Sequence, residues 1–117
     1  MINKDIRHQL KHFFCQFRSF HGTYIPEQRN TELAELLRHS ANISIMLDKE
    51  NPLSVMETMM MVVCVLNISD DDIADIFCLR RNTVHSYIES VKDKLNATTR
   101  MEAVMTSLRI GIIKIIY

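Results

Sequence analysis

The sequence predicts an all-α protein, in which a four-helix domain follows a short helical N-terminal region. The 117-residue chain contains only two glycines and two prolines, so few residues interrupt helices. Hydrophobic residues make up 47% of the chain, and many recur at spacings of three and four, as on one face of a helix. Three segments also begin with a hydroxyl residue followed three positions later by a carboxylate, which is the capping box of a helix N-terminus.

The first 50 residues are expected to hold two short helices. Apolar side chains at helical spacing predict one helix from about Lys4 to Phe20, carrying Ile6, Leu10, Phe13, Phe14, Phe17 and Phe20. Gly22 and Pro26 interrupt the pattern. A second helix follows, with Leu33, Leu36 and Leu37, and Met46 and Leu47 either extend it or lie in a connector. Because such helices bury little surface alone, we expect region 1–50 to be an arm or dimerisation element that packs on the second half or on another subunit.

Residues 53–117 form the predicted C-terminal domain, with helices at about 55–66, 70–77, 81–95 and 100–110. Capping boxes open the first, second and fourth helices, and they pair Ser54 with Glu57, Ser69 with Asp72, and Thr99 with Glu102. The third helix has no good capping residue at Arg80, although Asn82 could serve. Asn96 and Gly111 suit the left-handed backbone conformation in which many helices end.

The second and third of these helices have the layout of a helix-turn-helix. A short acidic helix is followed by a tight turn near Cys78 and Leu79, and then by a longer helix with basic residues at both ends. An apolar stripe on the longer helix is expected to face the core, and it consists of Val84, Ile88, Val91 and Leu95. In a helix-turn-helix the second helix enters the DNA major groove, so the pattern predicts a double-stranded DNA partner.

A set of residues recurs at fixed spacing through these four helices: Leu53, Ser54, Glu57, Ser69, Ile73, Ala74, Thr83, Val84, Lys94, Leu95, Arg100, Glu102, Ala103 and Val104. In this spacing the segment resembles, without a gap, the DNA-binding domain of LuxR/FixJ/NarL-type bacterial regulators. The resemblance covers nearly half of the chain. It implies that residues 53–111 are a LuxR-type helix-turn-helix domain of a transcriptional regulator, with four helices.

The resemblance also implies which residues meet DNA. The recognition helix at about 81–95 would lie in the major groove. The phosphate contacts would be Arg80, Thr83 and Lys94. The residues that face base edges would be His85, Ser86 and Glu89, with Arg81 and Asn82 at the rim of the groove. These residue types suit base reading, because arginine pairs with guanine, asparagine with adenine, and glutamate accepts from cytosine.

One departure from the family pattern bears on DNA affinity. Asp71 stands where the family has a lysine near phosphate, and it lies within the triplet Asp70-Asp71-Asp72. One interpretation is that this acidic face avoids DNA or recruits a basic partner. The other is that the triplet starts the helix, since carboxylates in a first turn are favourable by about 0.3–1 kcal/mol each. The two interpretations are compatible.

Composition narrows the remaining classes of function. Fourteen basic and fourteen acidic residues cancel, so net charge alone gives no support for nucleic-acid binding. The sequence has no Gly-rich phosphate loop and no arrangement of nucleophile and base, so we expect neither an enzyme nor a cofactor. The three cysteines have no paired spacing and indicate thiols of a reducing cytoplasm. We expect a cytoplasmic protein, because no signal peptide opens the chain and the longest apolar run, Met59–Leu66, is far shorter than the roughly 20 residues of a membrane span.

The first predicted helix carries two further patterns. His8, His12 and Cys15 lie on one face, but zinc prefers four ligands and no fourth is near in sequence, so no metal site is expected. The basic side chains of the same helix either add phosphate contacts or form an ordinary solvated face, and they are Lys4, Arg7, His8, Lys11 and Arg18.

The predicted function is a DNA-binding transcriptional regulator that acts as a homodimer. In the family the helix corresponding to 99–110 makes the dimer contact, which implies a role for its apolar residues Met101, Val104, Met105 and Leu108. The apolar tail at 112–117 must be covered by the N-terminal arm or by a partner. Region 1–50 is too short for the receiver or autoinducer-binding domain of larger relatives, so control is expected through abundance or a protein partner.

The alternative is a protein–protein modulator or antagonist. In this hypothesis the chain pairs with a full-length LuxR-type regulator and binds DNA weakly or not at all. The zero net charge and the aspartate triplet motivate it.

Overall fold

Helices dominate the computed structural model, which describes residues 4–19, 22–23 and 26–116. The helices are α1 (Lys4–Cys15), the 3-10 turn η1 (Glu27–Arg29), α2 (Asn30–Ala41), α3 (Val55–Val65), α4 (Asp70–Phe77), α5 (Arg81–Lys94) and α6 (Arg100–Arg109). The short strands β1 (Arg18–Ser19), β2 (Gly22–Thr23), β3 (Ile43–Ile45) and β4 (Ile113–Ile115) form two antiparallel pairs, β1 with β2 and β3 with β4. The predicted all-α class is confirmed.

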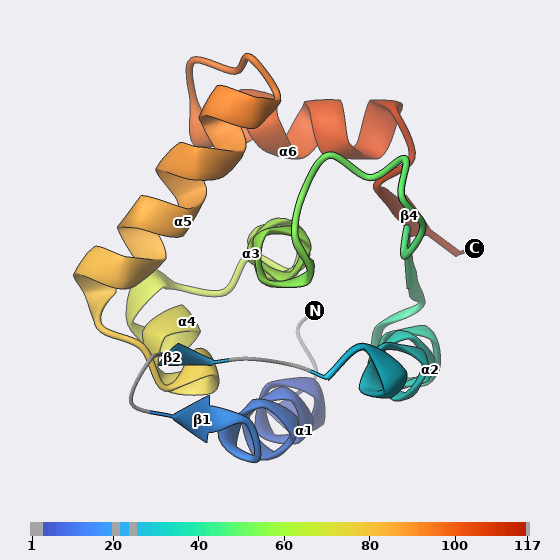
Figure 1. Cartoon of the computed structure of the whole chain (residues 1–117), viewed down its shortest axis with the longest axis vertical. Coiled ribbons are helices and arrows are strands. Elements are labelled where there is room, and N and C mark those ends of the chain that lie inside the picture. The colour runs from blue at the N-terminus through green and yellow to red at the C-terminus, as the bar shows by residue number, and fades with distance from the viewer. Residues whose placement is uncertain (1–3, 20–21, 24–25, 117) are drawn as a thin grey trace.

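Helix α3 is the centre of the core. Figure 1 shows it nearly end-on, with the other helices arranged around it. Every residue from Met56 to Val63 is buried, because a helix that is apolar on all sides is stable only when it is covered on all sides. The Met59–Leu66 run therefore belongs to a core helix, as its length predicted.

Helix α1 ends earlier than predicted. It stops at Cys15 instead of reaching Phe20, and Arg18 and Ser19 pair with Thr23 and Gly22 in the first strand pair. Phe17 still packs on Phe13, with ring centroids 5.2 Å apart, although it lies beyond the helix. Phe17 keeps the apolar spacing of the helix because its ring folds back onto the core. The prediction of a helix that reaches Phe20 was wrong. Phe20 lies outside the described residues.

The N-terminal region packs on the helix-turn-helix of its own chain. Helix α1 lies along α4, and the rings of Phe14 and Phe77 meet edge to face with centroids 4.7 Å apart. Ile6 and Leu10 of α1 and Leu37 of α2 belong to the same buried cluster as α3 and α4. The regions predicted as 1–50 and 53–117 therefore share one hydrophobic core, and their division into separate domains stays a prediction.

The apolar C-terminal tail is covered by a strand from the first half of the chain. In the β3–β4 pair, Ile43 lies opposite Ile115 and Ile45 opposite Ile113. The amide of Met46 donates to the carbonyl of Ile112 at 2.9 Å. Ile112 and Ile113 are fully buried as a result. The tail is covered by the first half of the chain, one of the two covers that the sequence predicts, while Met46 and Leu47 lie in a connector after β3, a strand that the sequence analysis does not predict.

Caps fix the ends of the helices. Only Ser54–Glu57 is a complete capping box among the three predicted. Ser69 and Thr99 each accept a hydrogen bond from the amide of the third residue of the helix, as predicted, without the reciprocal bond of a complete box. Asn96 and Gly111 have φ values of 55° and 87°, which confirms the predicted left-handed positions.

Candidate nucleic-acid interface

Helices α4 and α5 form a tight helix-turn-helix. Helix α4 ends at Cys78, whose φ of 55° places it in the left-handed region. The amide of Leu79 then donates to the carbonyl of Ala74 at 2.9 Å, which closes the helix and turns the chain. Arg80 is extended, and its side chain makes no capping bond, as the sequence predicted. The helix-turn-helix thus lies where the sequence located it.

Helix α5 has one buried face and one exposed polar face. Val84, Ile88 and Val91 are buried, and Leu95 is half-buried at the end of the helix. In or beside the first two turns, the exposed residues are Arg80, Arg81, Asn82, Thr83, His85 and Ser86. These six of the eight residues predicted to meet DNA form one exposed polar face, hereafter the α5 face. Of the other two, Lys94 is exposed at the far end of the helix and Glu89 is half-buried.

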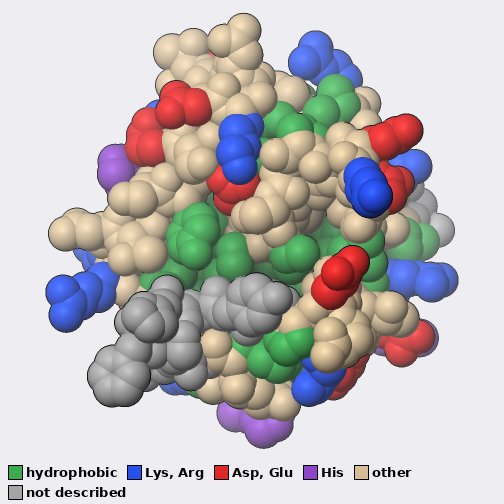
Figure 2. All heavy atoms as spheres, viewed as in Figure 1, with side chains coloured by type: hydrophobic (Ala, Val, Ile, Leu, Met, Phe, Trp, Pro, Cys, Tyr) green, Lys and Arg blue, Asp and Glu red, His purple; other side chains and the backbone are tan. Residues whose placement is uncertain are grey.

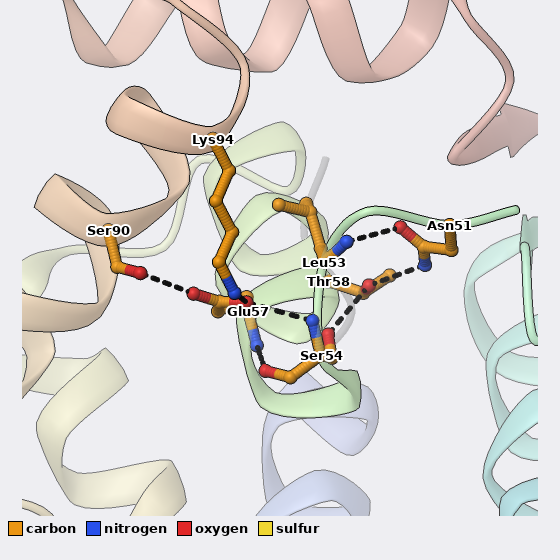
Figure 3. Close-up of polar contacts among 7 residues, drawn as sticks. All are labelled: Asn51, Leu53, Ser54, Glu57, Thr58, Ser90 and Lys94. Atoms are coloured by element: carbon orange, nitrogen blue, oxygen red, sulfur yellow. Dashed lines mark hydrogen bonds and ion pairs between the residues drawn. The ribbon is translucent and has the colours of Figure 1, made fainter. Parts of the chain in front are cut away.

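A buried carboxylate anchors α5 to the centre of the molecule. Glu57 of α3 accepts hydrogen bonds from the Ser54 amide at 2.8 Å, from Ser90 Oγ at 2.6 Å and from Lys94 Nζ at 2.7 Å. Figure 3 shows Ser90 and Lys94 pointing from α5 toward Glu57, which lies with Ser54 at the start of α3. These four residues, the Glu57 cluster, set the rotation of α5 about its own axis, and hence the direction in which the α5 face points.

The Glu57 cluster also determines the ionisation of its carboxylate. Burial by itself raises the pKa of Glu57, but the hydrogen bonds from Lys94, the Ser54 amide and Ser90 outweigh burial and hold the pKa below its ordinary value. The ionised carboxylate is therefore the form that the folded state prefers.

Lys94, one of the predicted phosphate contacts, forms an ion pair with Glu57 of the same chain. Its Nζ lies 2.7 Å from Glu57 Oε1, and its side chain remains 45% exposed. A phosphate contact from Lys94 would have to share the ammonium group with Glu57. Sequence reasoning saw Glu57 only as a capping residue and missed this ion pair, because nothing in the local pattern links α3 with the end of α5.

Each aspartate of α4 has a basic partner. Asp70 takes a two-pronged contact from Arg100, at 2.6 and 3.2 Å, and these hydrogen bonds lower the pKa of Asp70. Asp71 lies 3.3 Å from Arg81. The other two pairs reach α1, at 3.1 Å between Arg7 and Asp72 and at 2.9 Å between Lys11 and Asp75. The triplet lies in the first turn, where its favourable effect on the helix was predicted, and its charge is compensated from three other helices.

The remaining charges are mixed. Glu89, a predicted base contact, accepts a hydrogen bond from Lys92 at 2.9 Å, which lowers the pKa of Glu89, and its carboxylate lies 3.7 Å from His85 Nε2. On the face in Figure 2, basic and acidic side chains alternate around a hydrophobic middle, and no broad basic area is seen there.

The predicted dimerisation residues divide between the surface and the core. Met101 and Met105 project from α6 with exposed fractions of 69% and 58%. Leu108 is half-buried, and Val104 is buried. Ile110, just beyond α6, is also exposed.

Two further sequence patterns concern a metal site and a membrane span. Within residues 4–19, 22–23 and 26–116, no three His, Cys, Asp or Glu side chains are grouped as they would be around a metal ion. His8 and His12 lie exposed on α1, whereas Cys15 contacts Cys78. Among the same residues, no helix has both the length and the apolar character needed to cross a bilayer.

The fold and the α5 face define a helix-turn-helix protein. Residues 51–107, nearly half of the chain, match the family model of bacterial regulatory proteins of the luxR family, GerE. This segment is a LuxR-type helix-turn-helix domain, and the match supports a DNA-binding regulator in general. Neither the curated proteins nor the solved structures contain a significant match to the chain.

Proposed function

We propose that this protein is a transcriptional regulator that binds double-stranded DNA as a homodimer, with the α5 face in the major groove. The observation that carries the proposal is the two-sided character of α5. Its apolar side is packed in the core and held by the Glu57 cluster, while the residues of its first two turns are exposed and polar. A rigid helix with an exposed polar N-terminal end is what base reading in the major groove requires.

The proposed contacts follow from the side chains on this face. Arg81, Asn82 and His85 offer donors to base edges, with Ser86 and Glu89 farther along the helix. Arg80 and Thr83 flank the start of the helix and are proposed to meet phosphates. Lys94 is proposed to add a phosphate contact while it keeps its bond to Glu57.

The ion pairs of α4 support DNA binding, because they reduce the repulsion that the aspartates of α4 would exert on DNA. Asp70, Asp72 and Asp75 each face a basic side chain of α1 or α6, so their charge is largely compensated within the chain. Asp71 is paired with the recognition helix itself, through Arg81, whereas Asp70 lies near Arg81 and His85 but takes its hydrogen bonds from Arg100.

The proposed dimer uses α6. Met101 and Met105 form an exposed apolar pair one helical turn apart, which is costly to leave in water. Two-fold symmetry would place the half-sites of the operator about one helical turn of DNA apart.

DNA binding at several salt concentrations tests the proposal. A genome-wide map of bound sites supplies the operator, and its affinity is then measured by fluorescence anisotropy on short duplexes. We expect log affinity to fall with log salt by about 0.9 for each phosphate contact. Absence of salt-dependent binding to any mapped or genomic duplex would reject the proposal.

The dimer is tested separately by sedimentation. Met101→Asp with Met105→Asp should give a monomer that keeps its fold, whereas Leu47→Asp, at an exposed apolar residue outside α6, should remain a dimer. A monomeric wild-type protein would contradict the dimer.

A second candidate function is modulation of a full-length LuxR-type regulator. It is favoured by one observation: Arg81 and Lys94, two of the bases predicted to meet DNA, are paired with acidic side chains of the same chain. In that case purification from native cells would recover a larger regulator bound to this protein. Recovery of a homodimer that is fully active on DNA would count against it.

A further inference from the structure

The sulfur atoms of Cys15 and Cys78 lie 2.9 Å apart. Cys15 is the last residue of α1, and Cys78 occupies the turn between α4 and α5. Both are thiols in this structure, and either can donate the hydrogen bond between them. They are 63 positions apart in sequence, so only the packing of α1 on α4 brings them together.

The backbone at Cys78 is a second, independent observation. Four residues other than glycine have a positive φ in the described part of the chain, and the other three are asparagines: Asn42, Asn67 and Asn96. Asparagine tolerates the left-handed region, whereas an ordinary side chain is disfavoured there. A cysteine at this position is therefore explained poorly by backbone conformation and better by the chemistry of its sulfur.

The surroundings suit oxidation. Cys15 is exposed and Cys78 half-buried, and both line a surface hollow with Lys11, Asp75, Leu79 and Arg80. The ammonium group of Lys11, which donates a hydrogen bond to Asp75 at 2.9 Å, is also close enough to interact with both sulfurs. Cys64, in contrast, lies at the core, where burial raises the pKa of its thiol.

We propose that Cys15 and Cys78 form a reversible disulfide that staples α1 to the turn in front of the recognition helix. With a peroxide as oxidant, the Cys15 thiolate attacks one peroxide oxygen, so an S–O bond forms and the O–O bond breaks. The second oxygen leaves as hydroxide and takes up a proton to give water. The Cys78 sulfur then attacks the sulfenic sulfur of Cys15, the S–S bond forms, and the S–O oxygen leaves as a second water with the remaining proton. The two thiols lose two electrons, and the peroxide gains them; thiol reductants reverse the bond by exchange.

The disulfide acts as a staple because little has to move. The sulfur atoms must close from 2.9 Å to a bond of about 2.05 Å, so α1 and α4 keep their packing. The bond would close a long loop of the unfolded chain, which stabilises the folded state. This inference does not depend on DNA binding, and its test uses none.

The test treats the full-length protein with hydrogen peroxide and measures its intact mass and melting temperature. We expect the wild type and Cys64→Ser to lose about 2 Da, while Cys15→Ser and Cys78→Ser do not. The melting temperature of the oxidised wild type should rise by roughly 5 to 15 °C and return on reduction. Cleavage at aspartates, at Asp48 and in α4, puts Cys15, Cys64 and Cys78 on three different peptides and locates the bond by peptide mass in the wild type itself, so the result does not rely on a variant that folds.

Three outcomes would overturn the inference. The first is that the mass of the wild type does not decrease by about 2 Da, because peroxide oxidises Cys15 to the sulfinic acid instead. The second is a bond that includes Cys64 or links two chains. The third is a disulfide between Cys15 and Cys78 that leaves the melting temperature unchanged.

Discussion

The two helices of the helix-turn-helix use their polar residues in opposite ways. The aspartates of α4 form ion pairs with basic side chains of α1, α5 and α6, so the charge of this helix is paired within the chain. Helix α5 directs Ser90 and Lys94 inward to Glu57 but leaves the polar residues of its first two turns exposed. Helix α4 and the Glu57 cluster therefore hold the fold and orient α5, whereas the α5 face is available for a partner.

The largest expected effect is at the anchor of α5. Glu57→Ala would leave the Ser54 amide, Ser90 and Lys94 without their shared acceptor, and we expect the free energy of unfolding in urea to fall by about 2–4 kcal/mol. Glu89→Ala is the matched control, because Glu89 is a carboxylate near the surface of α5, and its loss should leave stability nearly unchanged. Similar losses in both variants would mean that the Glu57 cluster is not the anchor.

Low pH should weaken the hydrogen bonds by which Glu57 anchors α5. Because the folded-state pKa of Glu57 lies below its ordinary value of 4.5, ionised Glu57 stabilises the folded state above that pH. This contribution is lost as the pH falls below 4.5 and through the folded-state pKa. Glu57→Gln should therefore show a shallower loss of stability than the wild type in urea titrations below pH 5, and parallel pH curves would contradict this.

The next effect concerns the α5 face. Arg81→Ala and His85→Ala should each weaken binding to the mapped operator by roughly 5- to 150-fold, about 1–3 kcal/mol, with unchanged circular dichroism. Arg109→Ala removes another exposed base, from α6, and should lower affinity much less. If all three variants bind alike, base reading does not reside on α5.

A smaller effect should separate Asp71 from its neighbours. Asp71→Asn frees Arg81 and removes a negative charge beside the α5 face, so operator affinity should increase by roughly two- to tenfold at low salt. Asp72→Asn, whose partner is Arg7, should change affinity little. Anisotropy titrations of both variants at one salt concentration decide this, and an equal change in both would remove the distinction between Asp71 and the remaining aspartates.

The smallest effect is expected where α1 meets α4. Arg7 and Asp72 keep 34% and 48% of their side chains exposed, and ion pairs in such positions contribute at most about 1 kcal/mol. A double-mutant cycle of Arg7→Ala and Asp72→Asn in urea unfolding gives the coupling. A coupling well above this would show that the pair, and not the apolar packing of Phe14 on Phe77, holds α1 in place.

Much of the C-terminal fold could be predicted from sequence because its determinants are local. Ser54, Ser69 and Thr99 begin helices where their hydroxyls cap the next turn, and Asn96 turns the chain after α5. Val84, Ile88 and Val91 identified the buried side of α5, and so also the side left exposed. The prediction for the first helix was less accurate, because the spacing of Phe17 is consistent with a longer helix, whereas α1 ends at Cys15.

The helices, their caps and the helix-turn-helix can be predicted from the sequence, since each depends on residues within a turn or two of one another. Other contacts depend on how the whole chain packs: the partners of Asp70, Asp72 and Asp75, the bond between Glu57 and Lys94, the strand that covers the C-terminal tail and the contact of Cys15 with Cys78. The side chains in these contacts are 30 or more positions apart, and no spacing rule connects them. They meet because α3 is apolar on all sides and the rest of the chain must close around it.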